Sequence, residues 1–224
     1  MNDGELTGQA DTHITSVPHP PCQLHTHVAA PFLNLRRAAQ AEGIDLVPTS
    51  SFRDFARQLV IWNGKFSGER PMQGASGAPL DAATLTPRER VDAILLWSAL
   101  PGASRHHWGT DLDLVDRNAA AAGYQIKLTR EEFAHGGPFA KLDHWLAANA
   151  PRFGFFRPFR GVRSGVQPEP WHFSFAPVAE KARQRLTPQV LRSAIAGAPL
   201  LGKDVVLERL DELHARYVAA IDLP

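Results

Sequence analysis

The chain has little of what covalent staples, membrane insertion or broad electrostatic binding require. Its 224 residues include one cysteine, Cys22, which excludes an internal disulfide framework and a cysteine-based zinc finger. The longest apolar stretch, residues 93–103, is too short to span a bilayer. Lysine and arginine number 24 against 23 aspartates and glutamates, so no broad positive surface for nucleic acid is expected. These absences favour a globular protein without a membrane span or a nucleic-acid partner.

The amino-terminal residues lack the basic segment and apolar run of a secretory signal, so we expect a cytoplasmic protein. Residues 1–27 are polar, with several prolines and four histidines, and we predict a loosely ordered lead-in with solvated histidines. We expect the main domain over residues 28–178. Residues 179–224 are expected to form a helical extension packed on it.

Hydrophobic spacing predicts helices mixed with a few strands. Apolar residues recur at helical spacing over residues 30–42, 51–66 (with Ser50 or Ser51 as the cap), 88–100, 131–150 and two segments after residue 178. Strand patterns are found at residues 44–48, 110–115, 153–167 and 171–175. Helices and strands do not alternate regularly, so we predict an α+β fold, a small antiparallel sheet flanked by helices with a helical C-terminal extension.

Two of the predicted strands carry polar residues that suit metal chemistry. Residues 104–113 read SRHHWGTDLD, which places a histidine and a glycine turn before a strand with Asp111 and Asp113 on one face. Residues 169–172 read EPWH, which places a carboxylate three residues before a histidine on the polar side of its strand. Two imidazoles, a carboxylate and a spare glutamate are the composition of a catalytic zinc site.

Spacing alone does not decide between that metal site and a buried polar cluster beside aromatic strands, since no HExxH helix is present. Trp171, Phe173 and Phe175 are interpreted as core residues. The segment 67–87 is rich in glycine and proline, and a loop of that length is often a lid or a substrate-contacting segment.

The two motifs, in this order, resemble those of the VanY-type D-alanyl-D-alanine carboxypeptidases, a family of zinc metallopeptidases related to lysostaphin-like and hedgehog domains. Ser51-Phe52-Arg53 followed by Gln58 also resembles an upstream segment of that family, and residues 145–155 resemble the stretch before its second motif. The resemblance extends over about residues 44–176.

The resemblance implies one zinc ion per chain, with His106, Asp113 and His172 as ligands and Glu169 as the general base. It makes Arg53 the arginine that contacts the substrate or its developing oxyanion. A further implication is that Ser104 and Gln58 line the substrate pocket.

Two positions depart from the family pattern. Asp111 stands where the family has a small residue, and we predict that it lies outside the metal shell, bonded to an imidazole or facing the polar end of the substrate. His107 lies beside His106 and makes the choice of histidine ligand less certain.

The expected function is a zinc-dependent peptidase that removes terminal D-alanine from peptidoglycan stem peptides or other peptides ending in D-alanyl-D-alanine. One alternative keeps the chemistry and changes the bond, as in an L,D-carboxypeptidase or an endopeptidase of the stem. Another is a zinc-bearing binding module without catalysis, but the retention of Glu169 argues against it, because a structural zinc needs no base.

Overall fold

A four-stranded antiparallel sheet holds the two motif strands at its centre in the computed structural model, which describes residues 1–120, 123–161 and 163–224. Its strands are β3 (Leu46–Ser50), β6 (Asp111–Asp116), β8 (His172–Phe175) and β7 (Phe155–Phe156), in that order across the sheet. Two hairpins lie outside it, β1 (Ile14–Pro18) with β2 (Pro21–His25) and β4 (Met72–Gln73) with β5 (Pro79–Leu80). The expected segment 153–167 contributes only the short β7.

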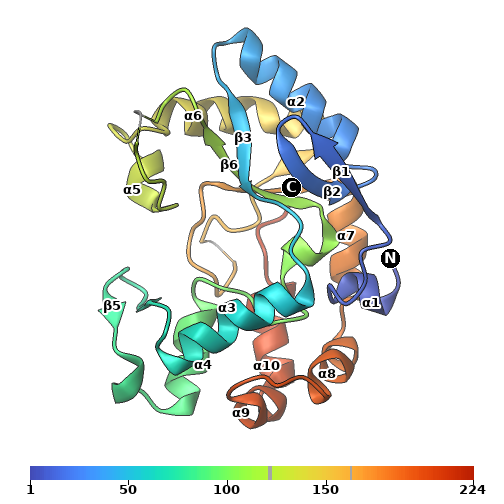
Figure 1. Ribbon diagram of the computed structural model, residues 1–224, viewed down its shortest axis with the longest axis vertical. Coiled ribbons are helices and arrows are strands. Elements are labelled where there is room, and N and C mark those ends of the chain that lie inside the picture. Colours follow the sequence, from blue (N-terminus) through green and yellow to red (C-terminus); the bar gives the residue numbers. More distant parts are fainter. Residues whose placement is uncertain (121–122, 162) are drawn as a thin grey trace.

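Helices lie at both ends of an elongated molecule (Figure 1). They are α1 (Asp3–Leu6), α2 (Ala29–Ala41), α3 (Phe55–Ser67), α4 (Pro87–Leu95), α5 (Arg130–Phe133), α6 (Ala140–Asn149), α7 (Ala176–Arg185), α8 (Pro188–Ala196), α9 (Lys203–Glu208) and α10 (Leu210–His214). Short 3₁₀ turns are η1 (Ala82–Thr84), η2 (Arg105–Trp108) and η3 (Ala150–Phe153), and the last turn, η4 (Ala215–Ala219), is π-helical. The predicted α+β class is confirmed.

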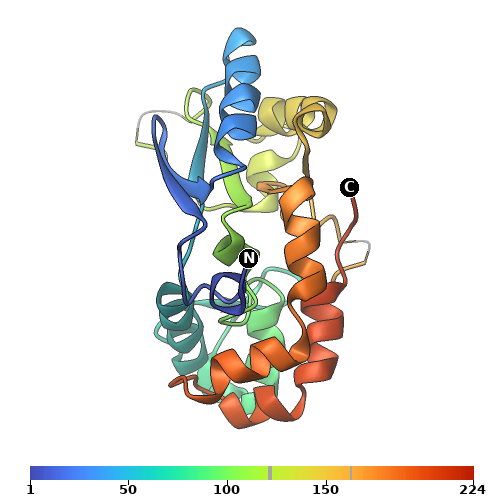
Figure 2. The same ribbon diagram turned by 90° about the vertical axis from the view of Figure 1, so that its right-hand side faces the viewer.

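Two hydrophobic cores divide these elements. The first packs one face of the sheet against α2 and α6, and its members include Phe32, Leu112, Leu142, Leu146 and Phe173. The second joins α3 and α4 to the C-terminal helices, and its members include Trp62, Ile94, Leu191, Leu210 and Tyr217. Figure 2 shows the sheet with α2 and α6 at one end, the C-terminal helices at the other, and α7 between them.

Sequence alternation correctly placed the two faces of the motif strands. Leu112, Leu114, Phe173 and Phe175 lie in the first core, as does Trp171, which directly precedes β8. Asp111 and Asp113 of β6 and His172 of β8 are therefore on the opposite face. This division of faces leaves the polar residues free to form a site.

The C-terminal part shares a hydrophobic core with α3 and α4, and the structure describes it as four helices, α7 to α10, rather than the two expected. Val206, Leu210, Leu213 and Tyr217 are buried, and α9, α10 and η4 share them. Helix α7 begins before residue 179, so the chain passes into this part without a linker.

The expectation of a loosely ordered lead-in with solvated histidines is wrong. Residues 1–27 form α1 and the β1–β2 hairpin, and His13 and His25 are buried, although His19 and His27 are exposed. Long-range contacts hold them: the Trp108 indole donates a hydrogen bond to the Leu6 carbonyl at 3.0 Å, and His13 Nε2 donates one to the His107 carbonyl at 3.0 Å.

The start of α3 also differs from the expectation. Asp54, not Ser50 or Ser51, caps this helix, with its carboxylate accepting a hydrogen bond from the Arg57 amide at 2.7 Å. Ser50 is the last residue of β3, whose pairing with β6 is irregular between Pro48 and Ser50, and Ser51 directly follows the strand. Arg53 therefore precedes the helix, on extended chain.

Among the described residues, no helix is both long and apolar enough to cross a membrane.

The turn that carries the first motif depends on a glycine. Gly109 follows η2 with a φ of 64°, and a Cβ there would lie 2.5 Å from Ile14 Cδ1 and 2.6 Å from the His25 amide nitrogen. The β1–β2 hairpin thus packs directly on the backbone of the motif turn.

We expect Gly109→Ala to lower the free energy of unfolding in urea by about 1 kcal/mol for the left-handed backbone and about 1–3 kcal/mol more for the overlap. The matched control is Gly43→Ala, whose φ of 77° is equally unfavourable but whose Cβ would meet nothing within 4 Å. Equal losses in the two variants would contradict the close packing of the hairpin.

Candidate active site

The register of the sheet brings the polar residues of the two motifs together. Asp113 of β6 lies opposite His172 of β8, and Asp111 lies opposite Ser174. Residues directly opposite in an antiparallel pair project to the same face with Cβ atoms about 5 Å apart. One face of the sheet therefore gathers two carboxylates, an imidazole and a hydroxyl.

His106 joins this group from η2. Its Nδ1 lies 2.8 Å from the Ser51 carbonyl oxygen, which only accepts, so Nδ1 donates and Nε2 is left as an acceptor. Nε2 lies 3.5 Å from Asp113 Oδ2. Across the group, His172 Nδ1 lies 3.4 Å from Asp113 Oδ1.

These three side chains fit a metal ion. One ligand atom each from His106, Asp113 and His172 lies within 4.8 Å of the others, and all three residues are buried. Asp113 Oδ1 is buried without a hydrogen-bond partner among the described residues. Two imidazole nitrogens and one carboxylate oxygen suit zinc and leave a fourth position for water.

Burial and mutual charge shift the pKa values of this cluster strongly. Burial raises the pKa of Asp113 to about 6. For His172, burial alone would lower the pKa, but hydrogen bonds with Asp111 and Glu169 and the charge of Asp113 outweigh it and raise the pKa to about 10. A proton on His172 thus offsets part of the negative charge of Asp111, Asp113 and Glu169. A divalent cation suits the same position and competes with that proton.

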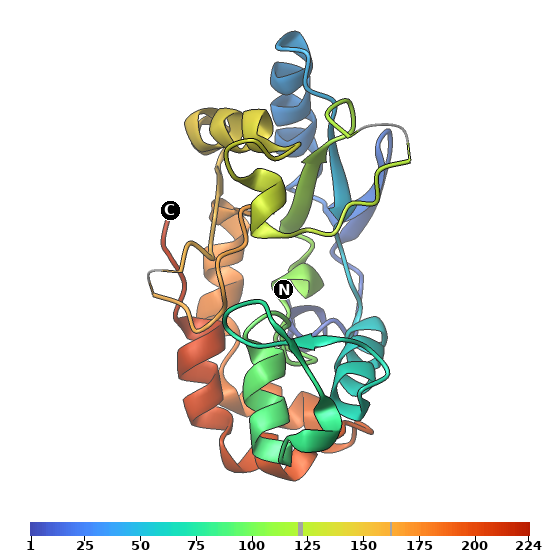
Figure 3. The ribbon, with the colours of Figure 1, turned by 90° about the vertical axis from the view of Figure 1, so that its left-hand side faces the viewer.

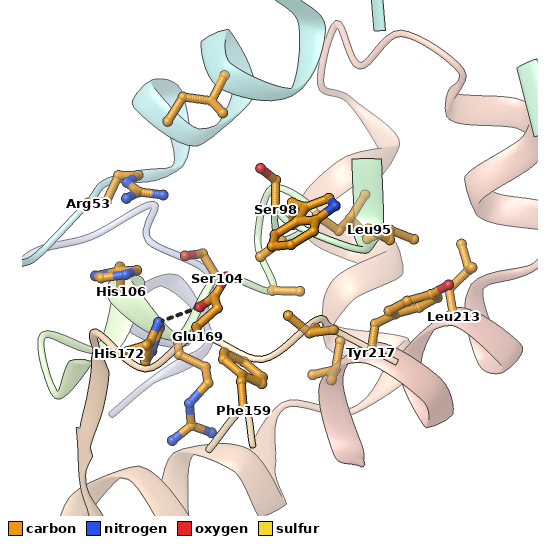
Figure 4. Close-up of a pocket in the computed structure, with 18 of the residues that line it drawn as sticks. Arg53, Leu95, Ser98, Ser104, His106, Phe159, Glu169, His172, Leu213 and Tyr217 are labelled. Carbon is orange, nitrogen blue, oxygen red and sulfur yellow. Dashed lines mark ion pairs between the residues drawn. The ribbon is translucent and has the colours of Figure 1, made fainter. Parts of the chain in front are cut away.

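Glu169 approaches the cluster from the chain just before β8. Its Oε2 lies 3.0 Å from His172 Nδ1, the same nitrogen that faces Asp113 (Figure 4). The Glu169 amide donates to the Phe159 carbonyl at 2.9 Å, which fixes the backbone. The carboxylate lines a cavity beside the three candidate ligands, where a base would need to be.

Arg53 lies on the side of His106 that faces away from His172 (Figure 4). It lines the cavity, and its guanidinium donates to Gln58 Oε1 at 2.8 Å and to Ser50 Oγ at 2.9 Å. Its amide donates to the His106 carbonyl at 3.2 Å, which ties it to the candidate ligand. Within 4.0 Å, no described carboxylate pairs with Arg53, so its charge is available to a ligand.

Of the other residues expected to bind substrate, the structure places only Ser104 on the cavity wall. The expectation is wrong for Gln58, which is 1% exposed and holds Arg53 with its oxygen and the Ala99 carbonyl with its amide. Gln58 therefore positions the arginine instead of contacting substrate.

Asp111 is also not at the substrate surface, because it is fully buried behind His172. Its Oδ1 lies 2.9 Å from His172 Nε2 and accepts a hydrogen bond from Arg105 Nε at 2.8 Å, and its Oδ2 accepts one from Ser174 Oγ at 3.0 Å. Burial would raise the pKa of Asp111, but the charges of Arg105 and His172 hold it well below the usual range. The carboxylate thus leaves Nδ1 of His172 to face the cluster, as a partner outside the metal shell does.

His107 is not placed to be a ligand. Its Nδ1 donates to the Arg53 carbonyl at 2.6 Å, and its Nε2 accepts from the Gly102 amide at 3.1 Å. Burial lowers the pKa of His107 to about 4, so the ring is neutral. His107 therefore holds the backbone of Arg53.

The cavity of about 340 Å³ extends from the candidate ligands toward the C-terminal helices. Sequence reasoning missed its far walls, which include Lys65, Ser98, Leu213 and Tyr217. The hairpin of segment 67–87 lies beside α4 (Figure 3), Gln73 lines the cavity, and the Gly74 carbonyl accepts a hydrogen bond from the Trp97 indole at 3.1 Å. That segment contacts the cavity, whereas its action as a lid stays a prediction.

The chain has recognisable relatives. Residues 21–178 match the family model described as VanY, D-alanyl-D-alanine carboxypeptidase. An uncharacterized protein of Haemophilus influenzae is 38% identical over 121 residues, or 53% of this chain and 92% of that protein. A D-alanyl-D-alanine carboxypeptidase of Enterococcus faecalis is 27% identical over 150 residues, or 65% of this chain and 46% of that protein.

Two solved structures have the same fold. VanYB in complex with D-alanine-D-alanine superposes with a TM-score of 0.55 at 20% identity, covering 85% of this chain and 91% of that one. A mutant of the vancomycin resistance D,D-pentapeptidase VanY in complex with Zn(II) gives a TM-score of 0.54 at 22% identity, covering 80% and 85%.

We expect Asp111→Ala to lower the free energy of unfolding by about 3–5 kcal/mol, because it leaves the buried guanidinium of Arg105 without a carboxylate. The double variant Asp111→Ala/Arg105→Met should recover part of this loss. The control Glu180→Ala removes a partly exposed ion pair with Arg183 and should cost about 1 kcal/mol or less. Chemical denaturation measures all three, and a loss below about 1 kcal/mol for Asp111→Ala would contradict the buried pair.

Proposed function

Because the chain belongs to the VanY D-alanyl-D-alanine carboxypeptidase family, we propose that it is a zinc-dependent carboxypeptidase that removes terminal D-alanine from peptidoglycan stem peptides. The observation that carries this proposal is the position of Glu169. Its carboxylate lies on the cavity wall, 3.0 Å from the nitrogen with which His172 faces Asp113. A glutamate beside a three-residue metal site supports catalysis over a structural zinc site.

His106, Asp113 and His172 would hold one zinc ion, which when bound supplies a Lewis acid and lowers the pKa of a bound water. Glu169 accepts the proton of the attacking water and returns it to the leaving amine. The position of Glu169 beside the candidate metal site is fixed by its backbone. Its amide donates a hydrogen bond to the Phe159 carbonyl, and Pro170 excludes a helix at this point.

Arg53 binds the terminal carboxylate of the substrate or the oxyanion that develops during attack. A planar guanidinium held at two points by Gln58 and Ser50 is oriented before substrate arrives, which lowers the cost of ordering it. The Asp111 carboxylate holds Nε2 of His172, and the Ser51 carbonyl holds Nδ1 of His106. The other nitrogen of each ring therefore faces Asp113.

Analysis of the reaction products shows which peptide bond of the substrate is hydrolysed. A D,D-carboxypeptidase converts a stem pentapeptide ending in D-alanyl-D-alanine into the tetrapeptide and free D-alanine. An L,D-carboxypeptidase shortens the tetrapeptide, and an endopeptidase cuts only cross-linked dimers. We expect mass spectrometry to show the first reaction, and shortening of the tetrapeptide alone would overturn the D,D-specificity while keeping the chemistry.

We expect the purified protein to carry about one zinc ion per chain and to lose activity reversibly on chelation. His172→Ala should lose the metal, because it removes one of the three ligands. Glu169→Gln should keep it and lose hydrolysis about 10²- to 10⁴-fold, because it removes only the base. Elemental analysis and peptide assays measure both.

The matched control is His144→Ala at an exposed histidine of α6, which should keep the metal and the activity. Full zinc content in His172→Ala would refute the ligand set. Wild-type hydrolysis in Glu169→Gln would refute the base.

A further inference from the structure

Lys65 lines the cavity on the side of Ser98, apart from Arg53. Lys65 lies near the end of α3, is half-buried, and donates from Nζ to Ser98 Oγ at 2.7 Å. Across the described part of the chain, no carboxylate lies within 4.0 Å of its ammonium group. A lysine ammonium has three donors, and here a neutral hydroxyl accepts one of them.

The surroundings make this charge costly unless a ligand compensates it. Burial lowers the pKa of Lys65, and the charge of Glu169 acts in the opposite direction. An ammonium group that loses water without gaining a carboxylate partner is destabilised. Lys65 thus lines the cavity and has no carboxylate partner among the described residues.

Helix α3 carries both Lys65 and Gln58, the residue that holds Arg53. Gln58, Ile61 and Lys65 follow at i, i+3 and i+7, so they lie along one face of the helix. Gln58 holds Arg53, and the Cα of Lys65 lies about 10 Å from that of Gln58 along the helix axis. Figure 4 shows Ser98 on the side of the cavity toward Leu95, whereas Arg53 lies on the side of His106.

That distance indicates which part of a peptide could reach Lys65. An extended peptide advances about 3.4 Å per residue, so 10 Å corresponds to about three residues, or two residues and an acidic side chain. In a carboxypeptidase substrate a single residue follows the scissile bond. When Arg53 binds the terminal carboxylate, a group about three residues farther along the peptide therefore belongs to the acyl part of the substrate.

We propose that Lys65 and Ser98 form a specificity-determining subsite for a second carboxylate, carried on the acyl side of the scissile bond. The preferred substrates are then acidic peptides with one carboxylate at the terminus and another about two residues before the cleaved bond. This inference rests on the proposed carboxypeptidase function and adds the substrate class to it.

The test compares two peptides that differ in one charge, N-acetyl-L-Glu-D-Ala-D-Ala and N-acetyl-L-Gln-D-Ala-D-Ala. We expect the wild type to favour the glutamate peptide about tenfold or more in kcat/KM, since a hydrogen bond between charged groups is worth that factor. Lys65→Met should bring the ratio near one, and Lys65→Arg should keep most of it. Lys181→Met, at an exposed lysine of α7, is the matched control and should show the wild-type ratio.

Several results would overturn the subsite. One is equal hydrolysis of the two peptides by the wild type, which would leave the carboxypeptidase function intact. Another is an unchanged ratio in Lys65→Met. A third is an equal loss on both peptides with a shifted pH profile, which would show that Lys65 acts through the charge of Glu169.

Hydrolysis of neither peptide would instead count against the proposed function. The subsite is then tested by titration calorimetry of the Glu169→Gln protein with the same two peptides. Tighter binding of the glutamate peptide, lost in the Lys65→Met/Glu169→Gln protein, supports the subsite, and equal binding refutes it.

Discussion

The pairing of β6 with β8 is the constraint on which the candidate site depends. Because Asp113 lies opposite His172, both side chains project to the same face at a separation that a metal ion can bridge. A shift of one residue would send one strand's polar side chains into the core beside Leu112 and Phe173. The apolar face of the sheet thus fixes the geometry of the polar face.

The remaining parts are attached to this sheet by buried hydrogen bonds. The Arg53 amide donates a hydrogen bond to the His106 carbonyl, and the Arg53 carbonyl accepts one from His107. The candidate ligand His106 and the substrate-binding candidate Arg53 are thus fixed to each other. Asp111 and Arg105 form a buried ion pair behind His172. Such a pair is a weak source of stability, because its desolvation offsets most of its attraction. Its value here is orientation, since it fixes which nitrogen of His172 faces the cluster.

Local patterns predicted the parts of this site that depend on one strand or one turn. Strict alternation placed Asp111, Asp113 and His172 on polar faces, and the family resemblance singled out Glu169 as the expected base. Alternation could not show that Asp111 is sealed behind His172, because that depends on the partner strand. The burial of His13 and His25 was missed for the same reason, since their hairpin packs on a glycine turn more than 80 residues later in the chain.

The cavity separates the chemistry from the recognition of the rest of the substrate. The candidate ligands, Glu169 and Arg53 all lie within residues 21–178, which match the family. Leu213 and Tyr217 line the same cavity from beyond that region, and the core that supports them also supports α3 with Lys65. A substitution in the C-terminal helices can therefore reshape the far end of the cavity without moving the sheet, because the two ends rest on different cores. This arrangement allows substrate preference to change while the metal site stays fixed.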